Sequence, residues 1–423
     1  MITILQKIKN LVKNRKFHES LALIDNIQNH EENFDLINIK AYIYFNLKEF
    51  KKSYHCYSKA IKINKNSFIC FNLRATVSFE LGNFKLAIED FKKALLINNK
   101  FYEPYENIGK CYSNLGNNKE AIKYYELALE QNPNNNRLVE MISEKFTELN
   151  TPLNTGSKIS KTNLAIKNIK YNYSSNSTIS DNLIKKIVNE AEHLINKNFE
   201  NLIFNQTQIF RKNNLNLNCD RHFLVFRSFK IIPEYCFSCI KVTINIDNVI
   251  ELIKLFLIFD NISLPNNNLR KCMIDLRKNS KANYKGFVYC RSIEDAMVVR
   301  ETINKVLKIN ISERLSANIK RGCSSFNDLY QGYENPKNNK VNYNSNWRQY
   351  EKVIDEKFTK FQSIKKNQET IKGISFNDIM IIRNWLFFAK LNNDESYKKI
   401  IDNIHLNLNL KKIIEQNKLN INN

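Results

Sequence analysis

The sequence has no apolar segment long enough to span a membrane, because its best candidate, residues 249–264, is interrupted by Glu251, Lys254 and Asp260. It also lacks the cleavage site of a secretory signal. Its nine cysteines therefore predict a reducing compartment, and we expect a cytoplasmic protein. No phosphate-cradling glycine loop and no metalloprotease motif occurs, which argues against those enzyme classes. Glycine and proline are scarce, at 8 and 6 residues, which we attribute to compositional bias.

The chain is 423 residues long, which predicts two or three domains rather than one. Its formal net charge is +23, and most of the excess positive charge lies in the second half. Such an excess favours solubility or affinity for anionic partners, such as nucleic acid, phosphates or acidic surfaces.

Residues 102–135 form a unit of two amphipathic helical segments, which meet at a turn containing Gly116 and end before Pro133. Four of its positions recur at an interval of about 34 residues. The small residues predict close approach of paired helices, and the aromatic residues fill the space opposite them. The recurring sets are Gly116, Ala121, Tyr125 and Ala128; Gly82, Ala87, Phe91 and Ala94; Lys48, Ser53, Tyr57 and Ala60; and a degenerate first set, Asn14, Phe17, Ser20 and Ile24.

This pattern resembles the tetratricopeptide repeat, a family of helix–turn–helix units of about 34 residues. The resemblance implies a helical solenoid whose first helices line a concave groove that holds an extended peptide of a partner protein. The alternative is that the groove positions are solvated or make contacts between repeats. The predicted groove residues are Asn38, Tyr42, Phe45, Asn72, Thr76, Phe79, Lys110 and Ser113.

Composition divides the chain into four parts. Residues 1–150 are predicted to be the repeat array, with 136–150 as a helix that caps its apolar end. Residues 151–180 are rich in Ser, Asn, Thr and Lys and are predicted to be a linker. Residues 181–323 form a Cys-rich domain, and residues 324–423 form a loop and a helical tail.

The Cys-rich part begins with a predicted helix, residues 182–199, which Ser180 or Asp181 could cap. A strand is then expected at residues 222–228. Further strands are expected at 240–246, 272–276, 286–290 and 316–320, with helices at 249–259 and 292–307. From residue 240 this is the order of a split βαβ, ferredoxin-like (βαββαβ) domain, with both helices on one face of an antiparallel sheet. The predicted fold class is therefore multidomain, α followed by α+β.

One cluster of soft ligands suggests a metal. A C-x-x-H pair, Cys219 and His222, precedes a C-x-x-C pair, Cys236 and Cys239. Two such pairs can supply the four ligands of a tetrahedral zinc site. The alternatives are small apolar cysteines beside a hydrogen-bonded histidine, or a Cys–His nucleophile pair with Glu234 as an acid or base, although no orienting group is identifiable. One of Cys272, Cys290 and Cys323 could also take the place of His222, and the alternative is that these three are core residues.

A second candidate site is a group of basic residues near the predicted strand ends. Residues 284–296 (YKGFVYCRSIEDA) resemble the third strand and following helix of an RNA-recognition motif, a family that stacks bases on its sheet. The resemblance implies a nucleic acid or another polyanion as partner; the alternative is a solvated basic sheet edge. The basic residues predicted to form this surface are Arg277, Lys285, Arg291, Lys320 and Arg321.

The leading hypothesis is thus an interaction protein. The repeat array would bind a peptide or protein, and a basic, zinc-stabilised α+β domain would supply a second surface. A nucleic-acid-binding regulator and a cysteine-dependent enzyme of unknown substrate are the alternatives.

Overall fold

The chain folds into two compact units. The computed structural model describes residues 2–149, 151–211, 213, 217–277, 282–337, 340–358, 370, 372–401 and 406–419. The first unit contains the residues up to Leu138 together with residues 355–358, and the second contains residues 139–354 and the described residues from 370 onward.

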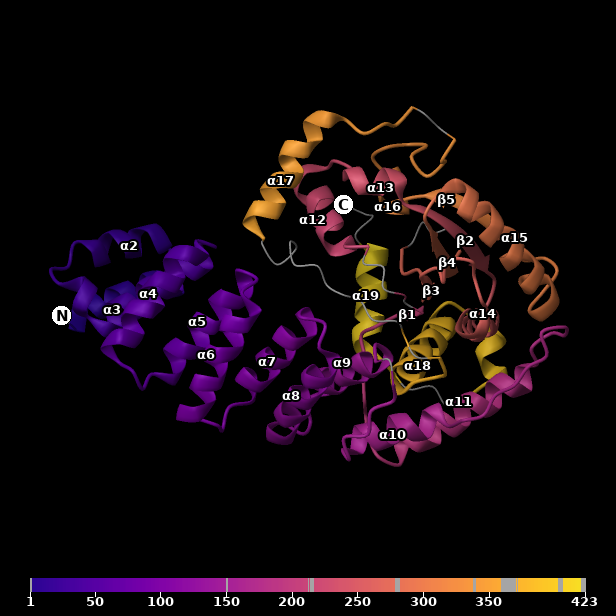
Figure 1. The fold of residues 1–423 in the computed structure, drawn as a ribbon, viewed down its shortest axis with the longest axis horizontal. Helices are drawn as coiled ribbons and strands as arrows, with labels where there is room; N and C mark the ends of the chain where they lie inside the picture. Colours follow the sequence, from indigo (N-terminus) through magenta and orange to yellow (C-terminus); the bar gives the residue numbers. More distant parts are fainter. Residues whose placement is uncertain are drawn as a thin grey trace. The chain divides into compact units, whose positions relative to one another are not determined.

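The first unit is a succession of antiparallel helix pairs, in which each helix packs on the next one along the chain (Figure 1). This is how a helical solenoid is built. Its elements are α1 (Ile2–Lys13), α2 (Phe17–Asp25), η1 (His30–Glu32), α3 (Phe34–Asn46), α4 (Phe50–Ile63), α5 (Phe68–Glu80), α6 (Phe84–Ile97), α7 (Tyr102–Asn114) and α8 (Asn118–Gln131).

The alanines at the recurring helical positions are fully buried, as the sequence predicts. In the α7–α8 pair, a Cβ atom added to Gly109 would overlap the ring of Tyr125, so the two helices approach as closely as glycine allows. Tyr125 is itself almost inaccessible to solvent. The alanines with no exposed surface include Ala87, Ala94, Ala121 and Ala128.

The turn inside each pair requires a left-handed residue. Gly82 and Gly116 have φ angles of 77° and 75°, and Lys48 occupies the equivalent position at 62°. In the first pair Arg15 takes this conformation at 57°, one residue beyond the position given by the sequence interval. A non-glycine residue is strained in this region of the Ramachandran plot, so the two early turns are less favourable than the two later ones.

Substituting the left-handed residue in two of these turns should change the stability of the first unit in opposite directions. Lys48→Gly should stabilise the first unit by about 0.5–1 kcal/mol, whereas Gly116→Ala should destabilise it by about 1 kcal/mol. Urea unfolding followed by far-ultraviolet circular dichroism measures both changes. Shifts of the same sign would contradict the assignment of strain to these turns.

The segment after the repeats differs from the sequence expectation. The helix α9 (Asn136–Thr147) was expected to cap the array, but from Val139 it belongs to the second unit. There the Glu140 carboxylate accepts the backbone N–H groups of Asn205 and Gln206, at 2.9 and 3.1 Å. Residues 151–180, expected to be a linker, contain the helix α10 (Lys158–Lys167). The buried residues of α10 recur at helical intervals, but most of the segment is polar, so this spacing is hard to recognise in the sequence. They include Ile159, Thr162, Asn163 and Ile166.

The second unit is built on one antiparallel sheet, whose strands follow the order β1-β3-β4-β2-β5 within the described residues. β4 pairs with both β3 and β2, and β5 pairs with the other side of β2. The predicted strands and helices between residues 240 and 321 are confirmed, and β1 is an additional edge strand. The bounds are β1 (Gln208–Arg211), β2 (Ile240–Ile246), α14 (Val249–Asn261), β3 (Arg270–Ile274), β4 (Tyr284–Cys290), α15 (Ile293–Asn310) and β5 (Ala317–Arg321).

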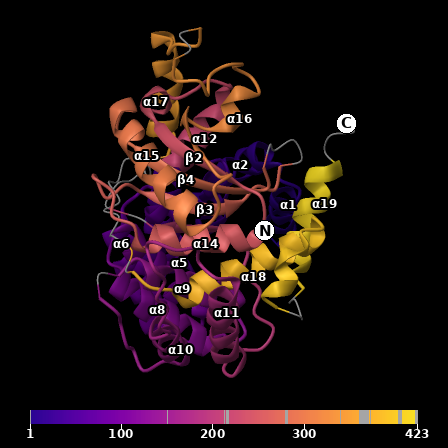
Figure 2. The same ribbon diagram turned by 90° about the vertical axis from the view of Figure 1, so that its right-hand side faces the viewer.

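The helix α14 covers one face of this sheet, and α12 and α16 lie on the other side of the strands (Figure 1, Figure 2). A Cβ at Gly286, in the middle of β4, would overlap Leu255 of α14. α14 is therefore buried along almost its whole length. The other helices are α11 (Asp181–Asn196), α12 (Cys219–Phe229), α13 (Glu234–Ser238), α16 (Ser324–Asn327), η2 (Ser345–Trp347), α17 (Arg348–Lys357), α18 (Phe376–Leu391), η4 (Glu395–Lys399) and α19 (Leu408–Leu419).

The strand expected at residues 222–228 is wrong, because these residues lie within the helix α12. His222 and Val225 are its buried residues, three apart, and Phe223 and Phe226 pack on the ring of Phe326. The run of aromatic and β-branched residues resembled a strand, but its burial follows the period of a helix. The cap of α11 is confirmed, since Ser180 accepts the Leu183 N–H at 3.2 Å. In the part of the chain that the structure describes, we find no helix with both the length and the apolar character that crossing a membrane requires.

Candidate peptide groove and buried polar network

A cavity of about 230 Å³ lies where the first helices of successive repeats meet. It is formed only by α1, α3 and α5, and it contains two of the predicted groove residues, Asn38 and Tyr42. The Tyr42 ring is 44% exposed, which is unusual for a large aromatic side chain in a packed repeat. The remaining lining residues, which sequence reasoning missed, are Lys9, Val12, Ile39 and Leu73.

The other predicted groove residues lie elsewhere on the first helices. Phe45 packs on Phe50 and Phe79 packs on Phe84 within their own repeats, at ring separations of 5.7 and 5.3 Å. Lys110 forms an ion pair with Glu106 at 2.6 Å. These three side chains therefore have contacts of their own inside the array, and Ser113 is half-buried near the end of α7.

Asn72 and Thr76 form a pair one repeat beyond Asn38 and Tyr42. The Thr76 hydroxyl donates to the Asn72 backbone oxygen at 2.9 Å. The side-chain Oδ1 of Asn72 is buried and has no hydrogen-bond partner within the described residues. A buried acceptor without a partner is costly, and this atom is not accessible from the cavity.

A second, larger cavity of about 390 Å³ lies between α3 and α4. The charged residues that line it are mostly basic. Some of these lysines form ion pairs with nearby carboxylates, as Lys59 does with Glu31 at 3.0 Å. The lining comprises His30, Glu31, Ile37, Lys40, Tyr44, Lys51, Lys52, His55, Cys56 and Lys59.

The four predicted zinc ligands lie in two helical segments rather than in a strand-and-turn arrangement. Cys219 and His222 occupy the first turn of α12, and Cys236 and Cys239 lie in and directly after α13. The His222 ring stacks on Tyr235 at 5.2 Å. Among the described residues, no group of three or more His, Cys, Asp or Glu side chains is arranged to hold a metal ion. As placed here, the predicted residues do not form a tetrahedral ligand set.

Cys323 lies close to the predicted ligands Cys236 and Cys239. It packs against the same apolar cluster as Cys236, and the Gly322 N–H donates to the Cys239 carbonyl at 2.7 Å. Burial raises the pKa of Cys219 to about 12 and that of Cys239 to about 11, and it raises the pKa of Cys236 further. Thiols with raised pKa values stay protonated at neutral pH, which disfavours a cysteine nucleophile.

The predicted basic residues are largely matched by partners. Arg277 and Lys285 both bind Asp275, at 2.7 and 2.6 Å, and Lys320 pairs with Glu334 at 3.3 Å. Arg321 is buried and donates to the Tyr333 carbonyl at 2.9 Å. Arg291 is exposed. These contacts leave little of the predicted charge free for a polyanion.

The sheet face opposite α14 carries an aromatic ring where the RNA-recognition resemblance expects base stacking. Phe287 of β4 lies beneath Lys241 and Lys271, whose ammonium groups are 5.1 and 5.2 Å from the ring centroid. Lys241 is buried. Because these lysines already contact the ring, the geometry does not favour stacking of a base on it.

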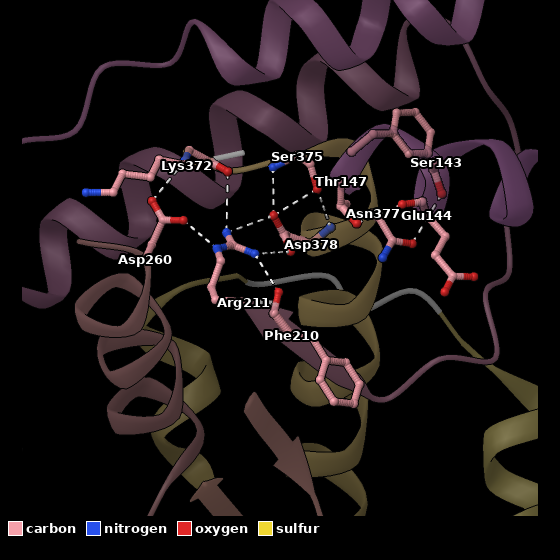
Figure 3. Close-up of polar contacts among 12 residues, drawn as sticks. Ser143, Glu144, Thr147, Phe210, Arg211, Asp260, Lys372, Ser375, Asn377 and Asp378 are labelled. Carbon is pink, nitrogen blue, oxygen red and sulfur yellow. Dashed lines mark hydrogen bonds and ion pairs between the residues drawn. The ribbon is translucent and has the colours of Figure 1, made fainter. Parts of the chain in front are cut away.

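A buried polar network in the second unit was not predicted (Figure 3). Arg211 of β1 binds Asp378 through two hydrogen bonds of 3.2 Å and also binds Asp260 of α14. Its guanidinium lies over the Phe256 ring, at 4.7 Å from the centroid. All three charged side chains are at least nine-tenths buried. The network thus joins β1, α14 and α18 across the interior of the unit.

Each carboxylate of this network has further donors. The Tyr171 hydroxyl and the Gly373 N–H bind Asp260, at 2.7 and 2.9 Å. The Ser375 hydroxyl and N–H donate to Asp378, at 2.8 and 2.9 Å. The bond from the Ser375 N–H, together with the Asp378 N–H that donates to the Ser375 hydroxyl oxygen at 3.2 Å, forms the capping box of α18. Burial opposes the charge of Asp260, but Arg211 and these hydrogen bonds lower the pKa of Asp260 below its ordinary value. No local sequence signal joins these residues, because they are separated by 49 to 167 positions.

Comparison with known families agrees with the repeats. Residues 34–67 match the family model of the tetratricopeptide repeat, and residues 74–153 match that of Regulator of microtubule dynamics protein 1-3. The N-terminal region is therefore built of tetratricopeptide repeats. No curated protein matches the chain.

Solved structures that resemble the chain include some that match between 26% and 47% of its length. The crystal structure of MamA is 15% identical and covers 33% of this chain and 82% of its own, with a TM-score of 0.32. YrrB, described as a TPR protein with an unusual peptide-binding site, is 19% identical over 34% and 74%, with a TM-score of 0.31. The first TPR of Spaghetti (RPAP3) bound to the HSP90 peptide SRMEEVD is 25% identical over 26% and 89%, with a TM-score of 0.26.

Proposed function

We propose that this protein is an interaction protein whose repeat array binds a peptide segment of a partner. The observation that carries the proposal is the cavity between α1, α3 and α5, which contains Asn38 and Tyr42. Tetratricopeptide repeats offer such a surface because their first helices lie side by side. Apolar walls with a few convergent polar groups are the usual composition of a binding pocket.

The lining also indicates how a peptide would bind. Val12, Ile39 and Leu73 provide apolar contact, and the exposed Tyr42 ring adds a large rigid surface. The Asn38 amide can pair with a peptide backbone, which needs one donor and one acceptor at each residue.

The charge of the array favours an acidic segment. The two cavities are lined by Lys9, Lys40, Lys51, Lys52 and Lys59. Lys40, Lys52 and Lys59 already pair with carboxylates, so the charge offered to a peptide comes chiefly from Lys9 and Lys51. Such complementarity chiefly raises the association rate and the specificity. We therefore propose an acidic, partly apolar peptide as the ligand class.

Binding should depend on Tyr42. Peptides selected from a synthetic library by panning against the full chain should bind Tyr42→Ala at least tenfold more weakly, because the variant loses the largest exposed contact of the cavity. Isothermal titration calorimetry measures the affinities. Asn38→Ala should give a smaller loss, since it removes one hydrogen-bonding group.

The matched control is Leu96→Ala, which removes an exposed apolar side chain on α6 that is outside both cavities. It should leave the affinity unchanged. A library that yields only peptides insensitive to Tyr42, or none enriched in Asp and Glu, would contradict the proposal.

For the second unit we propose a ferredoxin-like core extended by β1. The order β3-β4-β2-β5 and the antiparallel pairing of neighbours support this assignment, as do the connecting helices α14 and α15.

Zinc binding by this unit remains a prediction, which rests on the sequence spacing of Cys219, His222, Cys236 and Cys239. Metal analysis of the purified protein tests it. About one zinc per chain, lost in a Cys236→Ser, Cys239→Ser double variant, is the expected result, and a folded, metal-free protein would contradict it.

A further inference from the structure

Arg270, on the strand β3, is a buried cation without a matching partner. Its side chain is only 6% exposed, and its Nε and Nη1 atoms have no hydrogen-bond partner in the described part of the chain. Burying an ionised group without compensation costs several kcal/mol, so unpaired guanidinium groups are rare in protein interiors. The position calls for an explanation.

The nearest charged residue makes the mismatch larger. Arg270 is paired in register with Arg211 on the neighbouring strand β1, so two arginines lie side by side. The carboxylates of Asp260 and Asp378 are both bound to Arg211, and each also accepts further hydrogen bonds (Figure 3). Neither carboxylate hydrogen-bonds to Arg270.

The local charge is positive even when the whole network is counted. Lys167 is close enough to Arg211, Asp260 and Asp378 to interact with all three electrostatically. Three basic groups thus share two carboxylates. Burial, followed by the Arg211 charge, lowers the pKa of Arg270 to about 10, while Asp260 acts in the opposite direction. A group with that pKa is still a cation at neutral pH, so the imbalance persists.

We propose that Arg270 anchors a binding site for a small oxyanion, a phosphate or a carboxylate group, in the second unit. Guanidinium groups bind such anions through charge-assisted hydrogen bonds, and Nε and Nη1 together present three N–H groups that have no acceptor among the described residues. The anion restores neutrality where no described carboxylate hydrogen-bonds to Arg270. This site is separate from the peptide groove, and neither proposal depends on the other.

The test uses the full chain and inorganic phosphate. Both tryptophans, Trp347 and Trp385, belong to the second unit, so their fluorescence reports on its thermal unfolding alone. In a chloride buffer of constant ionic strength, added phosphate should raise the midpoint by about 2 °C or more, with saturation. Arg270→Met should show no response to phosphate, and its midpoint without phosphate should equal or exceed that of the wild type, because the buried charge is gone.

Two further variants make the result interpretable. Arg270→Lys keeps a cation and should keep part of the response, and Arg291→Met, which removes an exposed arginine, should keep all of it. Phenyl phosphate that stabilises at lower concentration than inorganic phosphate would identify the phosphate group of a larger molecule as the ligand. Acetate that acts in its place would identify a carboxylate.

Three outcomes would overturn the proposal. The first is an equal response to phosphate in wild type and Arg270→Met. The second is no response of the wild type to phosphate, phenyl phosphate or acetate. The third is an Arg270→Met variant that is less stable than the wild type at every phosphate concentration by the same amount.

Discussion

Replacing Arg211 by methionine should destabilise the second unit by about 3–5 kcal/mol. The change leaves Asp260 and Asp378 buried and close together without the cation that both bind. Removing one partner of a buried ion pair costs more than the pair contributes, because the remaining charge keeps its desolvation penalty. Urea unfolding followed by tryptophan fluorescence measures the loss, since both tryptophans lie in this unit.

Arg277→Met is the matched control for this experiment. Arg277 also binds a buried carboxylate, that of Asp275, but its own side chain is 46% exposed, and Lys285 contacts the same carboxylate. Solvent and the second cation therefore compensate for its removal, and the expected loss is about 1 kcal/mol or less. Equal losses of stability in the two variants would show that Arg211 is not needed to compensate the buried charges of Asp260 and Asp378.

The deficit of Arg211→Met should shrink as the pH falls from 7 towards 4. In the wild type, Arg211 counteracts burial and holds the pKa of Asp260 below its ordinary value of 3.8, so stability from this carboxylate is lost only in stronger acid. In the variant burial acts without Arg211 and raises the pKa of Asp260. Ionisation then costs stability above the raised pKa, and protonation relieves that cost as the pH falls. A pH-independent deficit would contradict this origin.

The repeats were accessible to sequence reasoning because their packing is local and periodic. Residues that recur at a fixed interval, such as Phe91 and Tyr125, fill equivalent positions in successive helix pairs. The strands between residues 240 and 321 were predicted for a similar reason, since runs of β-branched and aromatic residues alternate with helical segments.

The predictions that failed concern irregular segments. Residues 222–228 have strand-like composition, yet they form the helix α12 because its buried side packs on Phe326 of α16, far along the chain. The same applies to the site residues. Asn38 and Tyr42 were placed by the period of the repeat, whereas Lys9 and Val12 join the cavity from the degenerate first copy, where the period is weak.

The interior network shows the limit of such reasoning most clearly. Arg211, Asp260 and Asp378 come from three separate elements, and each alone looks like an ordinary charged residue of a basic chain. Only the fold reveals that two carboxylates bind Arg211 and that, in the part of the chain that is described, no carboxylate hydrogen-bonds to Arg270. Long-range charge pairing leaves no periodic trace in one sequence, so neither the network nor the unmatched cation was predictable.

Phe91→Ala should destabilise the first unit by about 3–5 kcal/mol. Phe91 is 1% exposed and packs in one cluster with Ala75 and Ala87 of its own repeat and Ile108 of the next, so its removal leaves a cavity at two interfaces. In a stacked array stability comes from each repeat and from its contacts with neighbours, and a central lesion weakens both. The unfolding transition by circular dichroism should move to lower urea, while the tryptophan transition of the second unit stays in place.

Two variants show whether volume and position cause this loss. Phe91→Leu restores most of the volume and should cost about 1.5 kcal/mol or less. Ile24→Ala, at the equivalent position of the degenerate first repeat, should cost less than Phe91→Ala, because Ile24 has the smaller side chain, although both residues are buried. If Ile24→Ala proved as damaging as Phe91→Ala, the first copy would be as well packed as the central repeats. The weak period there would then reflect different side chains that fill the same space, rather than a poorly packed end of the array.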